Sequence, residues 1–307
     1  MKRFKTSTFL MAAAMTAAVA LTGCAGSSDS GNTKAADTTA AAEADTTADT
    51  TADSSSDTGS GETAADVQKI IDSGILKVGT KIDVPKFGLQ NTGTGEMEGL
   101  EIDLAYEIAG KIFDCTAAEA KEKKLVSFQG VTAKTRGPLL DNGEVDLVIA
   151  TYTITPERKE TWNFSTPYYT DAVGLMVLKD SGITAIEDLD GKIIGVSQGS
   201  TTKEGFKAYV AEKGLNVNPD FEEFDGYPSL AAALAAKNID VFSVDRAILA
   251  GYNDDTTMIL EDRFAEQEYG VASKLDNKGL AELVDGVVTD LINSGTMDTM
   301  LKDWGIE

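Results

Sequence analysis

The sequence predicts an α/β protein, and three observations support this class. Short apolar runs at residues 75–80 (ILKVGT), 145–150 (VDLVIA) and 192–197 (KIIGVS) have the length and composition of buried strands. Amphipathic segments lie between such runs, and residues 100–113 place Leu100, Leu104 and Ile108 on one helical face. The folded part, which begins near residue 66, has roughly 240 residues, enough for one large core or two lobes. This alternation of strands and helices favours largely parallel sheets.

The remaining elements follow the same alternation. Strands are expected at residues 124–128, 174–179, 221–224, 241–244, 258–261 and 269–273. Helices are expected within 132–143, where Pro138 suits a first turn, and at 201–214, 229–238 and 280–292. The Gly-rich stretch 91–99 (NTGTGEMEG) follows no strand and lacks the GxGxxG spacing, so it predicts a hairpin or loop and not a nucleotide site.

Residues 1–23 have the pattern of an export signal. Three basic residues precede a short apolar run that is too short to span a bilayer comfortably. Cys24 follows Leu21-Thr22-Gly23, which resembles a bacterial lipobox, in which the cysteine is lipidated and becomes the mature N-terminus. An ordinary signal peptide followed by an unrelated cysteine is the alternative. We therefore expect an extracytoplasmic protein anchored to the cell membrane through Cys24.

Residues 24–65 form a low-complexity segment rich in Ala, Asp, Thr and Ser. It lacks aromatic and large aliphatic side chains, so it cannot bury enough apolar surface to offset the entropy of ordering. We expect a solvated stalk with an average end-to-end distance of about 35 Å.

Composition excludes several classes of site. The chain has no His, which removes Ser-His-Asp triads, Cys-His dyads and His-based metal sites. Its second cysteine, Cys115, has no partner for a disulfide once Cys24 is lipidated, and it is expected to be a half-buried structural thiol. Removal of residues 1–23 leaves 24 basic and 50 acidic residues, a net charge of −26. This charge argues against binding to nucleic acid or anionic lipid. No cofactor, metal or catalytic residue is expected.

Polar residues gather where the predicted strands end. Open α/β sheets bind ligands beyond the carboxyl ends of their strands. The residues found there are Lys81, Thr151, Thr153, Arg158, the Gln198–Thr201 stretch that opens a helix, and Asp245. Taken singly, each would serve as a surface or capping residue. Together they offer cations, hydroxyls, a helix N-terminus and one carboxylate, which complement the carboxylate and ammonium of an amino acid.

Four stretches give the sequence a definite resemblance. GTGEMEGLEIDLAYEIA (93–109), VDLVIATYTITPERKETWNFSTPYY (145–169), GKIIGVSQGST (191–201) and VFSVDRAILAGY (241–252) resemble the polar amino-acid family of solute-binding proteins of ABC transporters, family 3. The resemblance covers residues 66–307 and implies the type II periplasmic-binding-protein fold, with two α/β lobes joined by two crossing strands. Lobe one would comprise 66–167 plus 270–307, lobe two 173–264, and the hinge strands 168–172 and 265–269.

The resemblance also implies roles for single residues. Arg158 would clamp the α-carboxylate of the ligand with help from Thr153 and Thr201, the latter from the other lobe. Asp245 would accept from the α-ammonium.

A further set of residues is similar to the aspartate/glutamate-binding subgroup of this family. Its members are Lys81, Arg136, Thr151 and Tyr227. Lys81, Arg136 and Arg158 against Asp245 leave a surplus of two positive charges, which favours an acidic ligand because buried sites prefer paired charges. Alternatively, Lys81 and Arg136 neutralise acidic groups of the protein surface.

Several functions remain open from the sequence. The first is a monomeric, lipid-anchored receptor that passes aspartate or glutamate to an ABC permease and its ATPase. The second is the same role for a neutral polar amino acid such as glutamine. The third is an enzyme on the same fold, similar to the dehydratases that resemble these proteins, although the absence of His and the head-group clamp favour a non-enzymatic protein. A sensory or adhesive role is also compatible with a pair of binding lobes.

Overall fold

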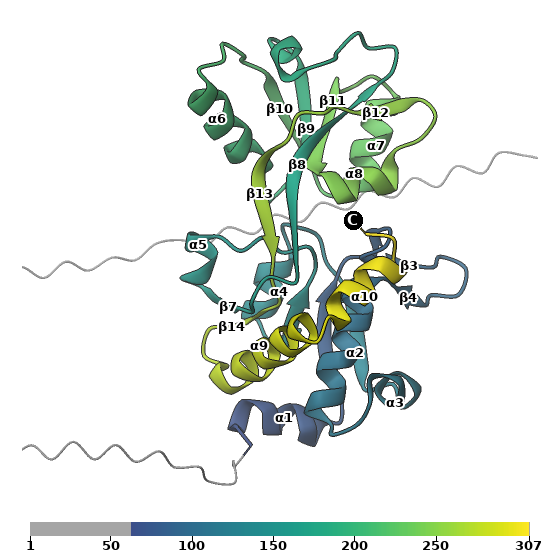
Figure 1. Ribbon diagram of the computed structural model, residues 1–307, viewed down its shortest axis with the longest axis vertical. Helices are drawn as coiled ribbons and strands as arrows, with labels where there is room; N and C mark the ends of the chain where they lie inside the picture. Colours follow the sequence, from purple (N-terminus) through teal and green to yellow (C-terminus); the bar gives the residue numbers. More distant parts are fainter. Residues whose placement is uncertain (1–62, 307) are drawn as a thin grey trace, which may run out of the picture. The chain divides into compact units, whose positions relative to one another are not determined.

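A computed structural model describes residues 63–306, which belong to one compact unit. The predicted signal peptide, Cys24 and residues 24–62 of the predicted stalk lie outside the described residues. Within 63–306 the chain builds two α/β lobes, each around its own sheet (Figure 1). None of the helices in this part of the chain combines the length and apolar character that a membrane crossing needs.

Lobe one contains, among the described residues, a five-stranded sheet and a small three-stranded sheet. The larger sheet has the order β5 (Val126–Gly130), β1 (Leu76–Thr80), β6 (Leu147–Ile149), β14 (Ala272–Lys274), β7 (Trp162–Phe164). The smaller sheet consists of β2 (Asp83–Val84), β3 (Gly88–Gln90) and β4 (Met97–Glu98). The Gly-rich stretch 91–99 forms the turn and second strand of the β3–β4 hairpin, as the sequence analysis allowed, but it follows the short strand β3, which was not predicted.

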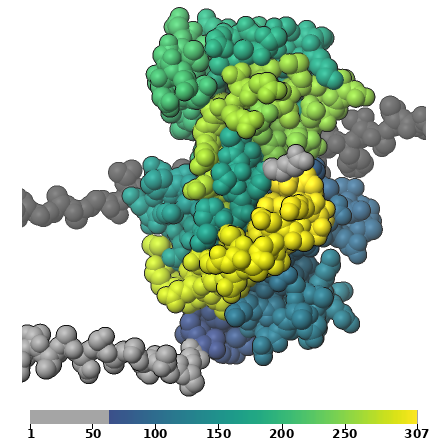
Figure 2. Space-filling model, in the orientation of Figure 1, coloured from purple at the N-terminus to yellow at the C-terminus, as the bar shows by residue number. Residues whose placement is uncertain are grey.

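Helices surround the larger sheet of lobe one. They are α1 (Ala65–Ser73), α2 (Leu100–Ile112), α3 (Ala117–Glu122), α4 (Arg136–Asp141), α5 (Pro156–Lys159), α9 (Lys278–Asn293) and α10 (Thr296–Asp303). The apolar face of α9 is buried, as its i, i+3, i+4, i+7 pattern predicts. In Figure 2, α9 and α10 (yellow) run across the visible face of lobe one. The indole of Trp304 donates to Asp103 on α2, which ties the end of α10 to the lobe.

Lobe two is built on the second large sheet. Its order is β10 (Asp220–Phe224), β9 (Ile193–Ser197), β11 (Val241–Asp245), β8 (Tyr169–Leu178), β12 (Thr257–Ile259), and β13 (Phe264–Tyr269) pairs with β8 off this path. Its helices are the 3-10 helix η1 (Ile186–Leu189), α6 (Thr202–Lys213), α7 (Tyr227–Ala235) and α8 (Arg246–Tyr252).

The expectation of largely parallel sheets is only half right. Within residues 63–306, β5, β1 and β6 are parallel in lobe one, and β10, β9 and β11 are parallel in lobe two. The strands β14 and β7 in lobe one, and β8, β12 and β13 in lobe two, pair antiparallel. The antiparallel strands include those with which the chain enters lobe two and returns, so no helical crossover sets their direction.

Two long strands connect the lobes. β8 and β13 pair antiparallel from Tyr169 opposite Tyr269 to Val173 opposite Phe264, and Figure 1 shows them running between the two sheets. The register shifts between Phe264 and Glu266, where Ala265 adopts a positive φ of 47°. This irregularity is a β-bulge in a connecting strand, a place where a strand can bend.

Candidate functional site

A cavity of about 10 Å³ lies where the two lobes meet. Six of the eight ligand-binding residues predicted from the sequence line it: Arg136, Thr151, Thr153, Thr201, Tyr227 and Asp245. Ala133, Ser200, Val244 and Gln267 complete the lining. This volume holds about one water-sized sphere. An amino acid can therefore enter only when the lobes or the lining side chains move.

Arg158 lies at the edge of this cavity and contacts both lobes. The hydroxyl of Thr155 caps the short helix α5 by accepting from the Arg158 N–H at 3.2 Å. The guanidinium donates to the carbonyl of Thr153 at 2.7 Å and, across the cleft, to that of Gly199 at 3.1 Å. Burial and the neighbouring Arg136 lower the pKa of Arg158 to about 10, so the group stays cationic at neutral pH.

Arg136 opens α4 and points into the cavity from lobe one. Its Nη1 donates to the carbonyls of Ala150 and Thr151 at 2.7 and 3.0 Å, and the guanidinium lies 3.9 Å from the centre of the Tyr152 ring. Within residues 63–306, neither the buried Nε of Arg136 nor the hydroxyl of Thr151 has a hydrogen-bond partner. Buried polar groups are normally paired, so these two donors are suited to a ligand acceptor.

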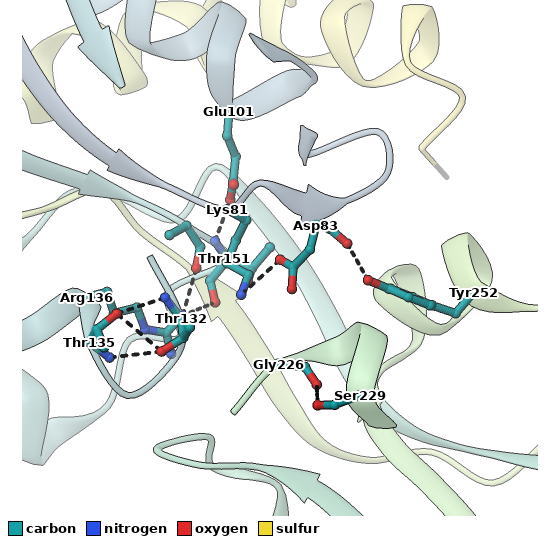
Figure 3. A network of polar contacts seen from close by, with 11 residues as sticks. Lys81, Asp83, Glu101, Thr132, Thr135, Arg136, Thr151, Gly226, Ser229 and Tyr252 are labelled. Carbon is teal, nitrogen blue, oxygen red and sulfur yellow. Dashed lines mark hydrogen bonds and ion pairs between the residues drawn. The ribbon is translucent and has the colours of Figure 1, made fainter. Parts of the chain in front are cut away.

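Glu101 supports this wall from behind, and the sequence analysis missed it. The side chain is fully buried, and one carboxyl oxygen accepts from the N–H of Thr151 (Figure 3). The same oxygen accepts from the hydroxyl of Tyr168. Thr151 has a positive φ of 44°, and the hydrogen bond that its N–H donates to Glu101 holds the backbone in this conformation. Burial raises the pKa of Glu101. The signal in the sequence was an acid on the same helical face as Leu104 and Ile108, at i, i+3 and i+7.

Lys81 is buried beside the cavity but already has a partner. Its ammonium forms an ion pair with Asp83 at 3.2 Å and lies 4.4 Å from the centre of the Tyr227 ring in lobe two (Figure 3 shows the ion pair). Burial lowers the pKa of Lys81. The charge count from the sequence left out Asp83, so the surplus of two positive charges is wrong, and the paired site has a surplus of one.

Asp245 ends β11 and faces the cavity from lobe two. It stands at the N-cap position of α8, yet its side chain makes no capping bond. Asp171 of β8 accepts from the Ala247 N–H at 2.8 Å instead, which leaves the carboxylate of Asp245 for the cavity. The hydroxyl of Tyr269 donates to Asp245. Burial raises the pKa of Asp245 to about 7, so a cation placed beside it would meet a readily ionised acceptor.

Gln267 joins the two predicted threonines, and the sequence analysis assigned it only to a crossing strand. Its amide oxygen accepts from the hydroxyl of Thr153 at 2.6 Å and from that of Thr201 at 2.8 Å. Thr201 stands at the N-cap of α6 but makes no side-chain cap, because its hydroxyl turns to Gln267. The signal was a polar residue two positions before Tyr269, on the buried face of a strand.

The mouth of the cleft is closed by the loop before α6. Lys134 donates to the side chain of Gln198 at 2.9 Å, and Gly199, with a φ of 77°, lies against the backbone of Ala133. A Cβ on Gly199 would come within 3.0 Å of the Ala133 carbonyl oxygen.

Within residues 63–306, cavities also lie away from the predicted site residues. A larger cavity of about 860 Å³ lies beside the crossing strands, with Asp171, Arg246 and Arg263 among its lining residues, and it contains none of the predicted site residues. No group of Cys, Asp or Glu residues within 63–306 has an arrangement that could hold a metal ion.

Comparison with known proteins identifies the family. Residues 76–307 match the model of the bacterial extracellular solute-binding proteins, family 3. The chain belongs to this family, as its sequence motifs indicated.

Individual relatives agree with this assignment. The ABC transporter glutamine-binding protein GlnH of Bacillus subtilis (strain 168) is 32% identical over 254 residues, which cover 80% of this chain and 88% of GlnH. The glutamate-binding protein GluB of Corynebacterium glutamicum is 30% identical over 244 residues, covering 76% of this chain and 79% of GluB. A solved structure of an ancestral arginine-binding protein bound to arginine has a TM-score of 0.64 and 30% identity, covering 75% of this chain and 98% of that one.

The predicted fold class and the general function are thereby confirmed. The protein has the two-lobe α/β fold of periplasmic binding proteins. It is the substrate-binding protein of an ABC amino-acid importer and not an enzyme.

Proposed function

We propose that the protein captures an acidic amino acid, aspartate or glutamate, between its two lobes. The observation that carries this proposal is the balance of donors and charges around the cavity. The cavity and its edge present Arg136, Arg158 and three threonine hydroxyls, but Asp245 is the one carboxylate among the lining residues. A ligand with two carboxylates and one ammonium complements such a set.

The head group of the ligand would bind at the Arg158 side of the cavity. Arg158 supplies a planar guanidinium for the α-carboxylate, and the hydroxyls of Thr153 and Thr201 lie on the two lobes beside it. Asp245 would accept from the α-ammonium. Because these groups come from both lobes, the ligand binds the closed arrangement better than the open one and shifts the population toward closure.

The side-chain carboxylate would bind at the opposite wall. The unpartnered Arg136 Nε and Thr151 hydroxyl point there, and Tyr227 holds Lys81 nearby. The paired charges of Lys81 and Asp83 cancel. Arg136, Arg158 and Asp245 then leave one positive charge, which a ligand of net charge −1 neutralises.

Glutamine is the second candidate, and one observation favours it. GlnH of Bacillus subtilis is among the most similar relatives. The charge of Glu101 also enters the balance: if it ionises, the site becomes neutral and suits a neutral ligand. Burial favours the uncharged form of Glu101, which supports the acidic ligand.

Titration calorimetry with L-aspartate, L-glutamate, L-asparagine and L-glutamine tests the proposal. We expect the wild type to bind an acid more tightly than the corresponding amide. Arg136→Met should reduce the ratio of acid to amide affinity by at least tenfold, because it removes the charge that faces the side-chain carboxylate. If the wild type prefers glutamine, the neutral candidate replaces the acidic one.

The lobe boundaries form part of the same proposal. Residues 66–167 with 270–307 would move as one body against 173–264, with hinges at 168–172 and 265–269. The pairing of β8 with β13 and the bulge at Ala265 support hinges in these strands. Hydrogen exchange of the backbone amides in 168–172 and 265–269 should slow when ligand is added, and unchanged exchange there would contradict these boundaries.

The proposal also covers the location of the protein and the partners to which it delivers its ligand. We expect a monomer that is lipidated at Cys24, carries its lobes on the 24–65 stalk, and delivers its ligand to a permease driven by an ATPase. Cys24→Ala should release the protein from the membrane fraction. Retention of this variant in membranes as firmly as wild type would refute the anchor.

A further inference from the structure

We infer that Gln267 couples ligand capture to the hinge: its amide oxygen competes with the ligand carboxylate for the hydroxyls of Thr153 and Thr201. The inference deepens the proposed function and rests on the head-group assignment made there. Gln267 lines the cavity, is 2% exposed, and lies in the crossing strand β13.

The orientation of the amide follows from its surroundings. The amide nitrogen donates to the carbonyl of Ala265 at 2.8 Å, which only a donor can do. The amide oxygen must therefore face the two hydroxyls, at 2.6 Å from Thr153 and 2.8 Å from Thr201. Each atom of the amide thus has a partner of the correct kind.

The competition arises because a hydroxyl has a single proton. Thr153 and Thr201 each donate to Gln267, so neither can donate to a ligand at the same time. When a ligand carboxylate takes these two protons, the Gln267 oxygen loses both donors. A charged acceptor makes a stronger hydrogen bond than an amide oxygen, so the exchange favours the ligand.

The same contacts join the lobes in the absence of ligand. Thr153 follows β6 of lobe one, and Thr201 precedes α6 of lobe two. Their shared acceptor therefore acts as a bridge that stabilises the closed arrangement. This bridge lowers the gain that the ligand obtains from closing the cleft.

The link to the hinge runs through the bulge. Gln267 donates to the carbonyl of Ala265, whose φ of 47° marks the register shift in β13. A change at the amide oxygen reorients the whole planar amide, and this alters the bond to Ala265. Ligand binding thus changes the conformation of the crossing strand β13 through the side chain of Gln267.

Gln267→Met tests the competition, because methionine has a similar length and cannot accept from the threonines in the same way. We expect the affinity for L-aspartate and L-glutamate to rise about fivefold, which corresponds to about 1 kcal/mol. The matched control is Gln68→Met on the exposed face of α1, which should leave both affinities unchanged. An unchanged or lower affinity of Gln267→Met would overturn the inference.

Gln267→Glu provides a second variant that keeps an acceptor at the same place. Its negative charge would hold the two hydroxyls more strongly and repel the ligand carboxylate. We expect its affinity for both acids to fall more than thirtyfold. Binding within threefold of wild type would show that the amide oxygen does not lie where the ligand carboxylate binds.

A measurement without ligand separates this inference from the proposed function. Glu157 of lobe one and Lys207 of lobe two are exposed and can each be replaced by a cysteine that carries a spin label, in a full-length chain without its two native cysteines. The labels report the distance between the lobes. Ligand-free Gln267→Met should shift the distance distribution to longer values than wild type. Identical distributions would refute the bridge whichever amino acid is bound. A wild type that binds neither acid would refute the proposed function while leaving this result valid.

Discussion

Binding of the ligand ammonium should expel a proton from Asp245 near neutral pH. The carboxyl is buried at the end of β11, and its pKa is raised to about 7 in the ligand-free protein. The main cause is burial, and the nearby Asp171 adds to it. The hydroxyl of Tyr269 and the charges of Arg136 and Arg158 act in the opposite direction. An ammonium placed against the carboxylate favours its charged form, so binding lowers this pKa.

The number of protons released follows from that value. A group with a pKa of about 7 that becomes fully ionised on binding releases about 0.9 proton at pH 6, about 0.5 at pH 7 and about 0.1 at pH 8. Because only the ionised form binds well, the affinity should fall about tenfold for each pH unit below 7. The chain has no His, so no imidazole titrates in this range.

Titration calorimetry in buffers of different ionisation enthalpy measures this release. The slope of the observed binding enthalpy against the buffer enthalpy gives the number of protons. Tyr269→Phe removes a hydrogen bond that lowers the pKa of Asp245, so the pKa should be higher in this variant. The release of a proton on ligand binding should therefore extend to higher pH than in the wild type. Tyr209→Phe, on α6 beside Phe264, is the matched control and should behave as wild type. A slope of zero at pH 6 in the wild type would refute the placement of Asp245 against the ammonium.

The same pKa has a consequence for stability. The native pKa of Asp245 lies above that of an unfolded chain, so the native state holds a proton that the unfolded state releases. This contribution to stability is complete below pH of about 4 and is lost as the pH rises to about 7, a total on the order of 4 kcal/mol. Thermal unfolding of ligand-free protein should show it, and Asp245→Asn should remove this pH dependence.

Three further outcomes are expected. Arg158→Ala should weaken acids and amides alike by about 2–5 kcal/mol in calorimetry while the protein stays folded, because it removes the partner of the α-carboxylate; equal binding would place the head group elsewhere. The double variant Lys81→Met/Asp83→Asn removes a buried ion pair without leaving a lone charge. Because the charges of Lys81 and Asp83 cancel, we expect the variant to keep the acid preference of the wild type, whereas a fall of tenfold or more would show that Lys81 also contacts the side-chain carboxylate. Gly199→Ala should weaken ligand binding several-fold more than Gly182→Ala, because both have a positive φ but only Gly199 meets the opposite lobe; equal effects would exclude closure at Gly199.

Local sequence patterns were sufficient for most elements. The apolar runs at 75–80, 145–150, 192–197 and 241–244 became β1, β6, β9 and β11, because a short run of apolar side chains is stable only when both sheet faces are covered. The helical face of α9 followed from its 3.6-residue period. Position after a strand also predicted four of the residues that line the cavity, Thr151, Thr153, Thr201 and Asp245, since ligands gather at the carboxyl edge of α/β sheets. The other two, Arg136 and Tyr227, were predicted from the family resemblance.

The short and antiparallel elements were harder to predict. β7 and α5 have too few residues to show a period, and they are stabilised by contacts with each other and with the rest of lobe one. α10 was also not predicted, and it packs against α9. The direction of β8 and β13 depends on the route of the chain between two lobes, which no local pattern contains.

Only the tertiary structure decided which side chains of the site form ion pairs and hydrogen bonds with one another. The sequence by itself determined that Lys81, Arg136, Arg158 and Asp245 are available, because residue type and position after a strand are local properties. It did not determine that Asp83 neutralises Lys81 or that Gln267 takes the hydroxyl protons of the two threonines. Lys81 and Asp83 are close in sequence, but their ion pair depends on how the chain folds after β1. The bonds of Gln267 join residues 66 and 114 positions apart, so they form only when both lobes have folded and closed. The charge that a ligand meets is therefore a property of the packed molecule, whereas the set of chemical groups is a property of the chain.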